Sequence, residues 1–552
     1  MHAVGTGAAE AMKKIKALGI AFAVALIQRV ASYYAIGILY DWHIFTWFFI
    51  WGNYNNWALN IENWGWMIEW TPAFIGSGML VGINTGVSMF LGSFFAWGFL
   101  GPILVHYNIC IGKKLLPDDP KWDGYVSFYS LSNIGKEGWV PSPRYWFLWP
   151  GVMVLICYSM AEFFVHWKVL YYGLKYAWHS SAAGINEFIA KRRQGNGVAF
   201  LEKQGRGKLD EDNLVEDFAT PDQQVPTLLW TIGVVIVVVA TCIIGELQFD
   251  MNAGLAILAS IFAVIFAFLS IHGAGVTDIT PLTASAKASQ LVFGGITTGQ
   301  GLSVTDAQTV NLIAGGIASG GADMSCSLVS DFRVGFLLRT PPKLQFFAQA
   351  VGTLVAMFLA PGTYRMLRML RVVWEDNSLT HRFTGIFVLF MAAYPCVINP
   401  DDYDHCAFSA PSVSAWRAVA EAVTNPNVPI PLSSGIFAIV LGVVAIGQVI
   451  LKRMVLFGDR EKYRIWLPNW MAIGVAFVIP QTVYSTATLT GALIAHFWVK
   501  RWPANFDRYC FAIAAGLIAG EGLGGVVGAA LQLGGVSGDV YGTQIACPAD
   551  SC

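Results

Sequence analysis

NLIAGGIASGGADMSCSLVSDFRVGFLLRTPPKLQFFAQAVG, residues Asn311–Gly352, is the stretch that decides the class of this protein. Its glycine- and alanine-rich apolar run carries an acidic residue, Asp323, at expected membrane depth. A charge at that depth is costly, and such residues mark a transport path or a structural ion pair. The run ends in further charged residues, Asp331, Arg333, Arg339 and Lys343. Among them the proline pair Pro341-Pro342 stops the helix.

The composition indicates that the solvent of this chain is the lipid bilayer. Of its 552 residues, 55% are hydrophobic and only 12% are charged, and the mean hydropathy is +0.54. These values depart far from those of soluble domains. We therefore expect an all-α polytopic membrane protein with re-entrant or broken glycine-rich segments. The net charge of −1 points to no charged partner, and we expect no nucleic-acid partner.

Apolar runs long enough to cross a bilayer recur along the chain, and about twelve transmembrane helices, with a range of 10 to 14, are predicted. The predicted spans lie near residues 17–40, 73–105, 146–167, 226–246, 252–273, 308–328, 345–362, 383–397, 433–452, 464–482, 484–500 and 508–533. The run at 73–105 is too long for one untilted helix. We expect it to break near its glycines and Asn84, giving two passes or a helix and a half.

Four segments organise the chain. Residues 1–167 form a first group of membrane segments, with a tryptophan-rich loop between the first two runs that is predicted to be interfacial or re-entrant. Residues 168–225 are predicted to be a polar cytoplasmic loop, 226–535 a second membrane group, and 536–552 a polar tail. Lysines at the amino end, Lys13, Lys14 and Lys16, place that end in the cytoplasm by the positive-inside rule.

The nine cysteines show no metal-binding spacing, so no metal site is predicted. Only Cys547 and Cys552, in the tail CPADSC, are placed to form a disulfide. We favour a free polar terminus over this bridge.

Glycines concentrate in three stretches: GSGMLVGINTG (76–86), GGITTGQG (294–301) with GGIASGGAD (315–323), and AAGLIAGEGLGGVVG (514–528). The last two share LIAGG and LIAGE, which place Asp323 and Glu521 at comparable positions of a faint internal repeat. Transporters use such broken segments to present backbone groups to substrate. We expect breaks near Asn84, Gly294 and Gly520.

A polar helix start follows the span that ends near residue 272. In TDITPLTASAKASQ (277–290), the proline is placed as first-turn prolines are, and hydroxyls and a lysine follow at helical spacing. One interpretation is an anion or carboxylate site, and an equally weighted one is a capped interfacial helix whose Lys287 reaches the headgroups. The candidate substrate-path residues here are Asp278, Thr280, Ser285, Lys287 and Gln290. The other candidates for the substrate path are Asn84, Asp331, Arg333, Pro341, Pro342 and Lys343.

These motifs resemble the oligopeptide transporter superfamily. The resemblance rests on DITPLTASAKASQ, on ADMSCSLVSDFRVGFLLRTPPKLQFFAQAVGT and on FAIAAGLIAGEGLGG. Pro341-Pro342-Lys343 is similar to the Pro-Pro-Arg motif of the peptide-transporting branch, with lysine in place of arginine. The Asn-Pro-Gly signature of that branch is not found, so the fungal-like and yellow-stripe-like branches both stay open. Members usually have more spans, so the chain resembles a member without the usual amino-terminal ones.

The resemblance implies secondary active transport, proton-coupled symport of small oligopeptides, or alternatively uptake of metal chelates of the siderophore or nicotianamine type. It implies no cofactor beyond the proton gradient, no enzymatic activity, and residence in the plasma membrane or a vacuolar or endosomal membrane. Carboxylates that change protonation would couple the proton: first Asp323 and Glu521, then Glu162 and Glu246. Glu162 lies one turn before His166, as a relay or, as we favour, a hydrogen-bonded pair.

Two other classes are remote alternatives. GGAD at 320–323 is similar to the Gly-x-Gly-Asp arrangement of intramembrane aspartyl proteases, but one glycine is out of place and no partner aspartate lies at membrane depth. A channel is the other class, and the sequence has no carbonyl filter or repeated charge ring.

Overall fold

A computed structural model describes residues 8–131, 140–165, 167–192, 197–205, 218–277, 282–374, 411–425, 430–456, 458–479, 482–533, 535–536, 538–545 and 547–548. The chain divides into two compact units. We call residues 159–361 the middle unit, and residues 2–158 with 362–552 the terminal unit. Each unit is described by itself below.

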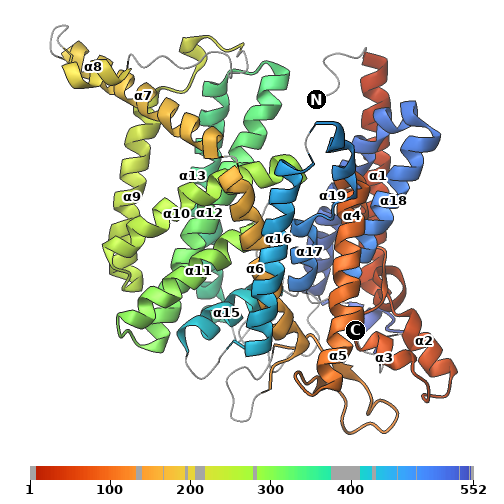
Figure 1. Cartoon of the computed structure of the whole chain (residues 1–552). Helices are drawn as coiled ribbons and strands as arrows, with labels where there is room; N and C mark the ends of the chain where they lie inside the picture. Colours follow the sequence, from red (N-terminus) through yellow and green to blue (C-terminus); the bar gives the residue numbers. More distant parts are fainter. Residues whose placement is uncertain are drawn as a thin grey trace. The chain divides into compact units, whose positions relative to one another are not determined.

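Almost all of the described chain is helical (Figure 1). Within the described residues, strands occur in two short antiparallel ribbons, β1 (Asp41–Trp42) with β2 (Ile68–Glu69) and β3 (Lys113–Lys114) with β4 (Val126–Ser127). Nine helices of the described part are long and apolar enough to cross a membrane. The prediction of an all-α polytopic membrane protein is confirmed. The predicted span at 383–397 lies outside the described residues.

Glycines hold the first and last long helices of the terminal unit together. Helices α1 (Ala8–Tyr34) and α19 (Pro503–Leu533) lie side by side (Figure 1). Four glycines of α19 at a spacing of four residues, Gly516, Gly520, Gly524 and Gly528, face α1, and a Cβ atom on Gly520 would lie 2.3 Å from the Phe22 carbonyl oxygen. Small residues at this spacing let two membrane helices approach closely. The predicted break near Gly520 is therefore wrong, because α19 is continuous there.

Helix α4 (Pro72–Ser93) packs on α18 (Val483–Arg501) through glycines on both helices, Gly78 and Gly491. Its continuation runs through a π-helical turn, η2 (Phe94–Leu100), into α5 (Gly101–His106). Gly82 has φ 81° and interrupts the helical backbone of α4, a conformation that glycine adopts without a Cβ clash. The predicted break near Asn84 is confirmed.

The tryptophan-rich segment folds back on α1. It contains η1 (Ile36–Tyr40), α2 (Ile44–Trp51) and α3 (Ala58–Glu62). The Gln28 side-chain amide donates to the Leu39 carbonyl at 2.7 Å, and the Arg29 guanidinium lies 4.2 Å from the centre of the Tyr40 ring. The chain that leaves α1 thus returns along its last two turns. Trp51 is 69% exposed, as expected at headgroup depth.

The remaining elements of the terminal unit are α6 (Pro143–Val165), which crosses into the middle unit, α15 (Pro411–Thr424), α16 (Leu432–Met454), η5 (Gly458–Trp466), α17 (Trp470–Val478) and α20 (Gly538–Tyr541). The prediction of one span at 464–482 is wrong. Asn469 caps a separate short helix there, since its side-chain oxygen accepts from the Met471 and Ala472 amides. The nine residues of α17 are too few to cross a bilayer.

The predicted free polar tail is also wrong. The Thr543 amide donates to the Tyr34 carbonyl at 2.8 Å, and Ala35 and Thr543 form an isolated β-bridge. Cys547 is buried and disulfide-bonded, with its partner outside the described residues. The tail docks because the end of α1 leaves backbone acceptors that it satisfies.

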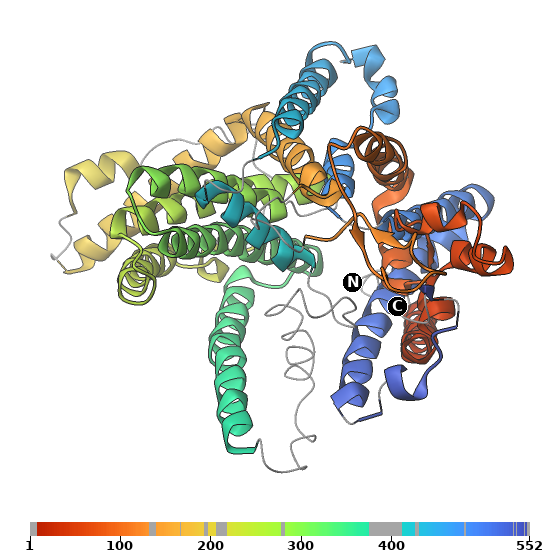
Figure 2. The same cartoon turned by 90° about the horizontal axis from the view of Figure 1, so that it is seen from below.

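The middle unit is built on three helices, α10 (Ala253–Thr277), α11 (Leu282–Gly299) and α12 (Val304–Leu338), whose packing is followed in Figure 2. Their contact buries Met251, Ala256, Phe293, Val310 and Ala314. Helix α11 is continuous through Gly294, so the break predicted there is wrong. Helix α12 starts at Ser303, whose hydroxyl accepts from the Asp306 amide at 3.2 Å, as amino-terminal caps do.

The other helices of the middle unit are α7 (Trp167–Arg192), α8 (Ala199–Gly205), η4 (Pro221–Gln223), α9 (Thr227–Phe249) and α13 (Pro342–Trp374). Much of the predicted polar loop at 168–225 is therefore helical. Helix α12 ends at Arg339, in the left-handed conformation with φ 55°, and α13 begins at Pro342. The proline pair ends the helix as predicted.

Candidate functional site

Glu521 connects α19 to the first turn of α4. Its Oε2 accepts from the Ala73 amide at 2.5 Å, directly after Pro72, the first residue of α4. The first amides of a helix have no intrahelical acceptor, and the amino-terminal end of the helix dipole favours a carboxylate. The structure thus brings one of the predicted proton-coupling residues to the amino-terminal end of a broken helix.

Two more carboxylates lie beside this helix end, on the ribbon that precedes it. In the register of β1 and β2, Asp41 is paired directly with Glu69. Glu69 is 4% exposed, and its Oε1 accepts a hydrogen bond from the Thr71 hydroxyl. Like charges directly opposite each other in a ribbon destabilise it when both are ionised. The pair is therefore poised to hold a proton.

A histidine and a glutamate complete the group. The His43 Nδ1 is hydrogen-bonded to the Glu62 Oε1, and both side chains are buried. We call Asp41, His43, Glu62, Glu69 and Glu521 the carboxylate site. Four of its five members come from the tryptophan-rich segment and one comes from α19.

Burial and mutual charge set the protonation of the site. Burial raises the pKa of Glu69 to about 8, with a further upward contribution from the charge of Asp41. Burial also raises the pKa of Asp41 to about 6, against the opposing effects of His43 and Arg29. For His43, burial lowers the pKa, but the hydrogen bond to Glu62 and its charge outweigh burial and the net pKa is raised. Burial and the neighbouring charge thus both raise the pKa of Glu69, and burial raises that of Asp41, so the two groups favour a shared proton over two charges.

Several acceptors in the site have no donor. Asp41 Oδ1, Glu62 Oε2 and Glu69 Oε2 are buried and have no hydrogen-bond partner among the described residues. A buried acceptor without a partner is costly. In the described ranges, no group of three or more His, Cys, Asp or Glu side chains is arranged to hold a metal ion.

The polar residues of α11 lie inside the middle unit. Ser285, Lys287 and Gln290 are each 0% exposed, and the Asn311 Nδ2 donates to the Gln290 carbonyl at 2.5 Å. Lys287 therefore does not reach the headgroups, which removes the interpretation of α11 as an interfacial helix with a snorkelling lysine. Asp278 and Thr280 lie outside the described residues.

The other predicted carboxylates are in different environments. Asp323 is exposed on the surface of the middle unit, and Glu246 is exposed on α9. Glu162 is 7% exposed on α6, and its predicted relay partner His166 lies outside the described residues. Asp323 belongs to the middle unit, whereas all five residues of the carboxylate site belong to the terminal unit.

The charged residues after Asp323 lie around the turn between α12 and α13, with Asp331 and Arg333 in the last turns of α12, Arg339 in the turn and Lys343 in the first turn of α13. Asp331 accepts from the Gln349 Nε2, and the Arg333 guanidinium lies 5.5 Å from the ring centre of Phe336. Pro341 lies in the turn, Pro342 opens α13 and Lys343 is half-buried. Arg339 and the proline pair end α12 and start α13.

Asn84 has a structural partner. It lies two residues beyond the break at Gly82, and its Nδ2 donates to the Ile465 and Leu467 carbonyls at 2.9 and 3.0 Å. Asn84 thereby ties the broken helix α4 to the linker that precedes α17.

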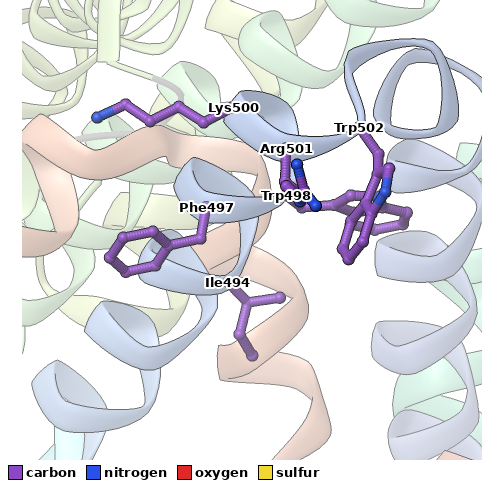
Figure 3. Close-up of a pocket in the computed structure, with 6 residues that line it drawn as sticks. All are labelled: Ile494, Phe497, Trp498, Lys500, Arg501 and Trp502. Carbon is purple, nitrogen blue, oxygen red and sulfur yellow. The ribbon is translucent and has the colours of Figure 1, made fainter.

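A surface pocket at the end of α18 is lined by apolar and basic side chains, unlike the carboxylate site (Figure 3). Its lining includes Trp498, Lys500 and Arg501, and the Arg501 guanidinium lies 5.8 Å from the ring centre of Trp502. Aromatic and cationic residues together at a helix end are typical of headgroup depth. We interpret this pocket as part of the lipid-facing surface.

Sequence reasoning missed Asp41, His43, Glu62 and Glu69. A signal was present, because these residues stand in DWH and in IENWGWMIEW, between tryptophans and isoleucines. The rule that singled out Asp323, a charge within an apolar stretch, applies to them equally.

The fold and the site define a class: a polytopic, all-helical membrane protein with buried carboxylates at the end of a broken helix. The profile of the family described as "OPT oligopeptide transporter protein" matches residues 1–532. The chain belongs to this family, which confirms the resemblance seen in its motifs.

Relatives of both branches are found. A protein named "Putative oligopeptide transporter YGL114W", from Saccharomyces cerevisiae, is 24% identical over 84% of this chain and 59% of its own length. The metal-nicotianamine transporters YSL2 and YSL1 of Arabidopsis thaliana are 21% and 22% identical over 89% and 92% of this chain. The match covers 64% and 66% of their lengths. The chain thus spans less than two thirds of each of these relatives.

Proposed function

We propose that this protein is a secondary active transporter that couples proton entry to the uptake of small oligopeptides. The observation that carries the proposal is the bond from Glu521 of α19 to the first turn of α4, next to the half-buried Asp41 and the buried Glu69. Protonation of Glu521 removes the charge that favours the amino-terminal end of α4. The contact between α19 and α4 then weakens, which gives the alternating-access cycle a proton-controlled step.

The break at Gly82 supports a role of α4 in the cycle. A helix that is interrupted near its middle exposes backbone groups, which in transporters line substrate cavities. Backbone amides and carbonyls match the termini and peptide groups of a small peptide. We propose Asn84 as a residue that sets the position of this break, and the break as part of the substrate path.

The middle unit supplies further candidates. We propose the buried residues Ser285, Lys287 and Gln290 of the middle unit as candidates for recognising a carboxylate, since the Lys287 amine is fully buried and a buried amine favours an acidic partner. Asp323 stays a candidate for a second coupling carboxylate, because it lies within α12, a helix long and apolar enough to cross a membrane.

Uptake of metal chelates is the second candidate function. It is favoured by the relatives named metal-nicotianamine transporters. The metal would enter as part of the substrate, held by its chelator. A chelate and a peptide both present carboxylates and amines, so the same path suits either substrate. We place the protein in the plasma membrane or in a vacuolar or endosomal membrane, where one side is acidic.

The test is uptake into liposomes that contain the full chain. Labelled di- to pentapeptides and metal chelates are compared under an imposed pH gradient, with and without a protonophore. We expect accumulation that collapses with the protonophore, and Glu521→Gln should abolish accumulation while leaving substrate exchange. Glu461→Gln is the control, because Glu461 is 65% exposed and pairs only with Arg464 among the described residues.

Two results count against the proposal. Accumulation that persists with the protonophore removes proton coupling. Accumulation by Glu521→Gln equal to that of the control removes this residue from the mechanism. Unchanged proton dependence in Asp323→Asn would likewise exclude Asp323.

A further inference from the structure

The β1–β2 ribbon sorts its side chains onto two faces. Asp41 is paired with Glu69 and Trp42 with Ile68, and side chains alternate between faces along a strand. Asp41 and Glu69 therefore share one face, while Trp42 and Trp70 stack on the other with ring centroids 6.3 Å apart. Directly opposed side chains in an antiparallel pair have Cβ atoms about 5 Å apart. Two carboxyl groups at that distance are within reach of each other.

The hydrogen bonds of the pair leave room for one more donor. The Thr71 hydroxyl donates to the Glu69 Oε1. The Glu69 Oε2 and the Asp41 Oδ1 are buried and find no donor among the described residues. A carboxylate only accepts hydrogen bonds, whereas a protonated carboxyl group also donates one. A single proton between the two groups therefore satisfies both oxygens.

We infer that Asp41 and Glu69 together form a binding site for one exchangeable proton, and that the proton which drives transport occupies this site before it reaches α4. The proton site itself does not depend on the proposed function, whereas its use in transport does. Binding adds one proton from water, and the pair goes from two negative charges to one. Release restores the second charge.

The surrounding charges favour one bound proton. Arg29 of α1 is the cation whose charge acts on both carboxylates, while Glu521 of α19 adds a negative charge facing Glu69. The His43–Glu62 pair lies next to Asp41. Three tyrosines, Tyr40 of η1, Tyr129 and Tyr484 of α18, also face the pair. Apart from the His43–Glu62 pair, the unprotonated site sets the Arg29 guanidinium against three carboxylates, Asp41, Glu69 and Glu521. Burial makes this excess of negative charge costly.

The position of the pair connects it to the cycle. Glu69 lies two residues before Thr71, which precedes α4, and Glu521 is bound to the first turn of the same helix. Lysines at the start of α1 predict a cytoplasmic amino end, which places the ribbon after α1 toward the opposite side. A proton from that side meets Asp41 and Glu69 first. Its charge is then felt at the amino-terminal end of α4.

The experiment measures protonated carboxyl groups directly, without transport. The purified full chain is titrated in detergent while the carbonyl stretch of protonated carboxyl groups is followed by difference infrared spectroscopy. We expect the wild type to lose one such band around pH 8. Glu69→Gln should lack this band. Asp41→Asn should keep it but move its midpoint to lower pH, since the neighbouring negative charge is gone.

The matched control is Asp123→Asn. Asp123 is 60% exposed and pairs with Lys114 at 2.7 Å, so its removal should leave the band unchanged. Size-exclusion profiles of all variants establish that each is folded. A band that survives Glu69→Gln overturns the inference, and so does a midpoint that Asp41→Asn fails to move. Displacement of the band by sodium or calcium at fixed pH also overturns it, because the site would then hold a metal cation.

The same variants separate this inference from the proposed function. If the band behaves as expected but accumulation in liposomes ignores the protonophore, the proton site stands and proton-coupled transport is wrong. If accumulation is proton-driven and Glu69→Gln leaves both the band and the coupling intact, transport stands and this site is wrong.

Discussion

Replacing Gly520 by alanine tests whether glycine packing holds α19 against α1. The added methyl group would lie 2.3 Å from the Phe22 carbonyl oxygen and 2.9 Å from the Ala25 Cβ. The first neighbour is helix backbone, which cannot rotate aside as a flexible side chain does. The two helices must therefore move apart. Gly522, two residues further along α19, has nothing within 4 Å of its position for a Cβ atom, so Gly522→Ala is the matched control.

The magnitude follows from two opposing effects. Alanine is preferred to glycine within a helix by about 0.8–1 kcal/mol, and this gain is shared by both variants. Overpacking a tight contact costs about 1–3 kcal/mol, and only Gly520→Ala incurs it. The difference between the variants isolates the steric cost, so we expect Gly520→Ala to be less stable than Gly522→Ala by about 1–3 kcal/mol.

The assay is thermal unfolding of both purified variants and the wild type in one detergent. A loss of 1 kcal/mol lowers the melting temperature by roughly 2–4 °C in chains of 150–250 residues, and by less in longer ones. We expect Gly520→Ala to melt a few degrees below Gly522→Ala. Equal melting temperatures would refute the close approach of α1 and α19.

Three further predictions concern the site and the two units. Asn84→Ala removes two hydrogen bonds at 2.9 and 3.0 Å, worth about 1 kcal/mol each. Amide hydrogen exchange in the segment before α17 should therefore become faster, and unchanged exchange would contradict this role of Asn84. Between about pH 4.3, where unfolded glutamate titrates, and about pH 8, the pKa of Glu69 in the folded state, only the folded state holds this proton. Stability should therefore fall as pH rises through this window, and Glu69→Gln should lessen the slope of melting temperature against pH. In the middle unit, Asn311→Ala should lower the free energy of unfolding, measured in denaturant, by about 1–3 kcal/mol, because it breaks a buried hydrogen bond at 2.5 Å. Ser289→Ala should lower it less, since that hydroxyl has no hydrogen-bond partner among the described residues. Equal losses of stability in the two variants would refute this.

Local sequence signals predicted most of the helices. Apolar runs mark the spans because a bilayer requires about 20 apolar residues per crossing, and α9, α10 and α16 match predicted spans closely. Positions that depend on packing were harder. The glycines near 294 and 520 resemble a break in sequence, but α19 uses its glycines for contact with α1. A glycine serves either purpose, and only its neighbours decide which.

The candidate site was predicted only in part. Glu521 was identified because an acid within an apolar run is costly wherever it lies. The same cost applies to Asp41 and Glu69, but the tryptophans around them suggested an interface, where charges are cheap. Lys287 illustrates the opposite outcome. Its spacing allowed either a buried or a headgroup position, and the packing of α11 on α12 buries it.

By itself, the sequence determined the solvent of this protein, the type and approximate position of its helices, and its family. Hydropathy and motifs are local properties, and they need no knowledge of distant contacts. Only the tertiary structure decided which carboxylates meet. Ala73 and Glu521 are 448 positions apart in the chain and are joined by one hydrogen bond, while the Asp41–Glu69 pair depends on the register of a two-residue ribbon. Such pairings arise from packing and register, which no periodicity of the chain encodes.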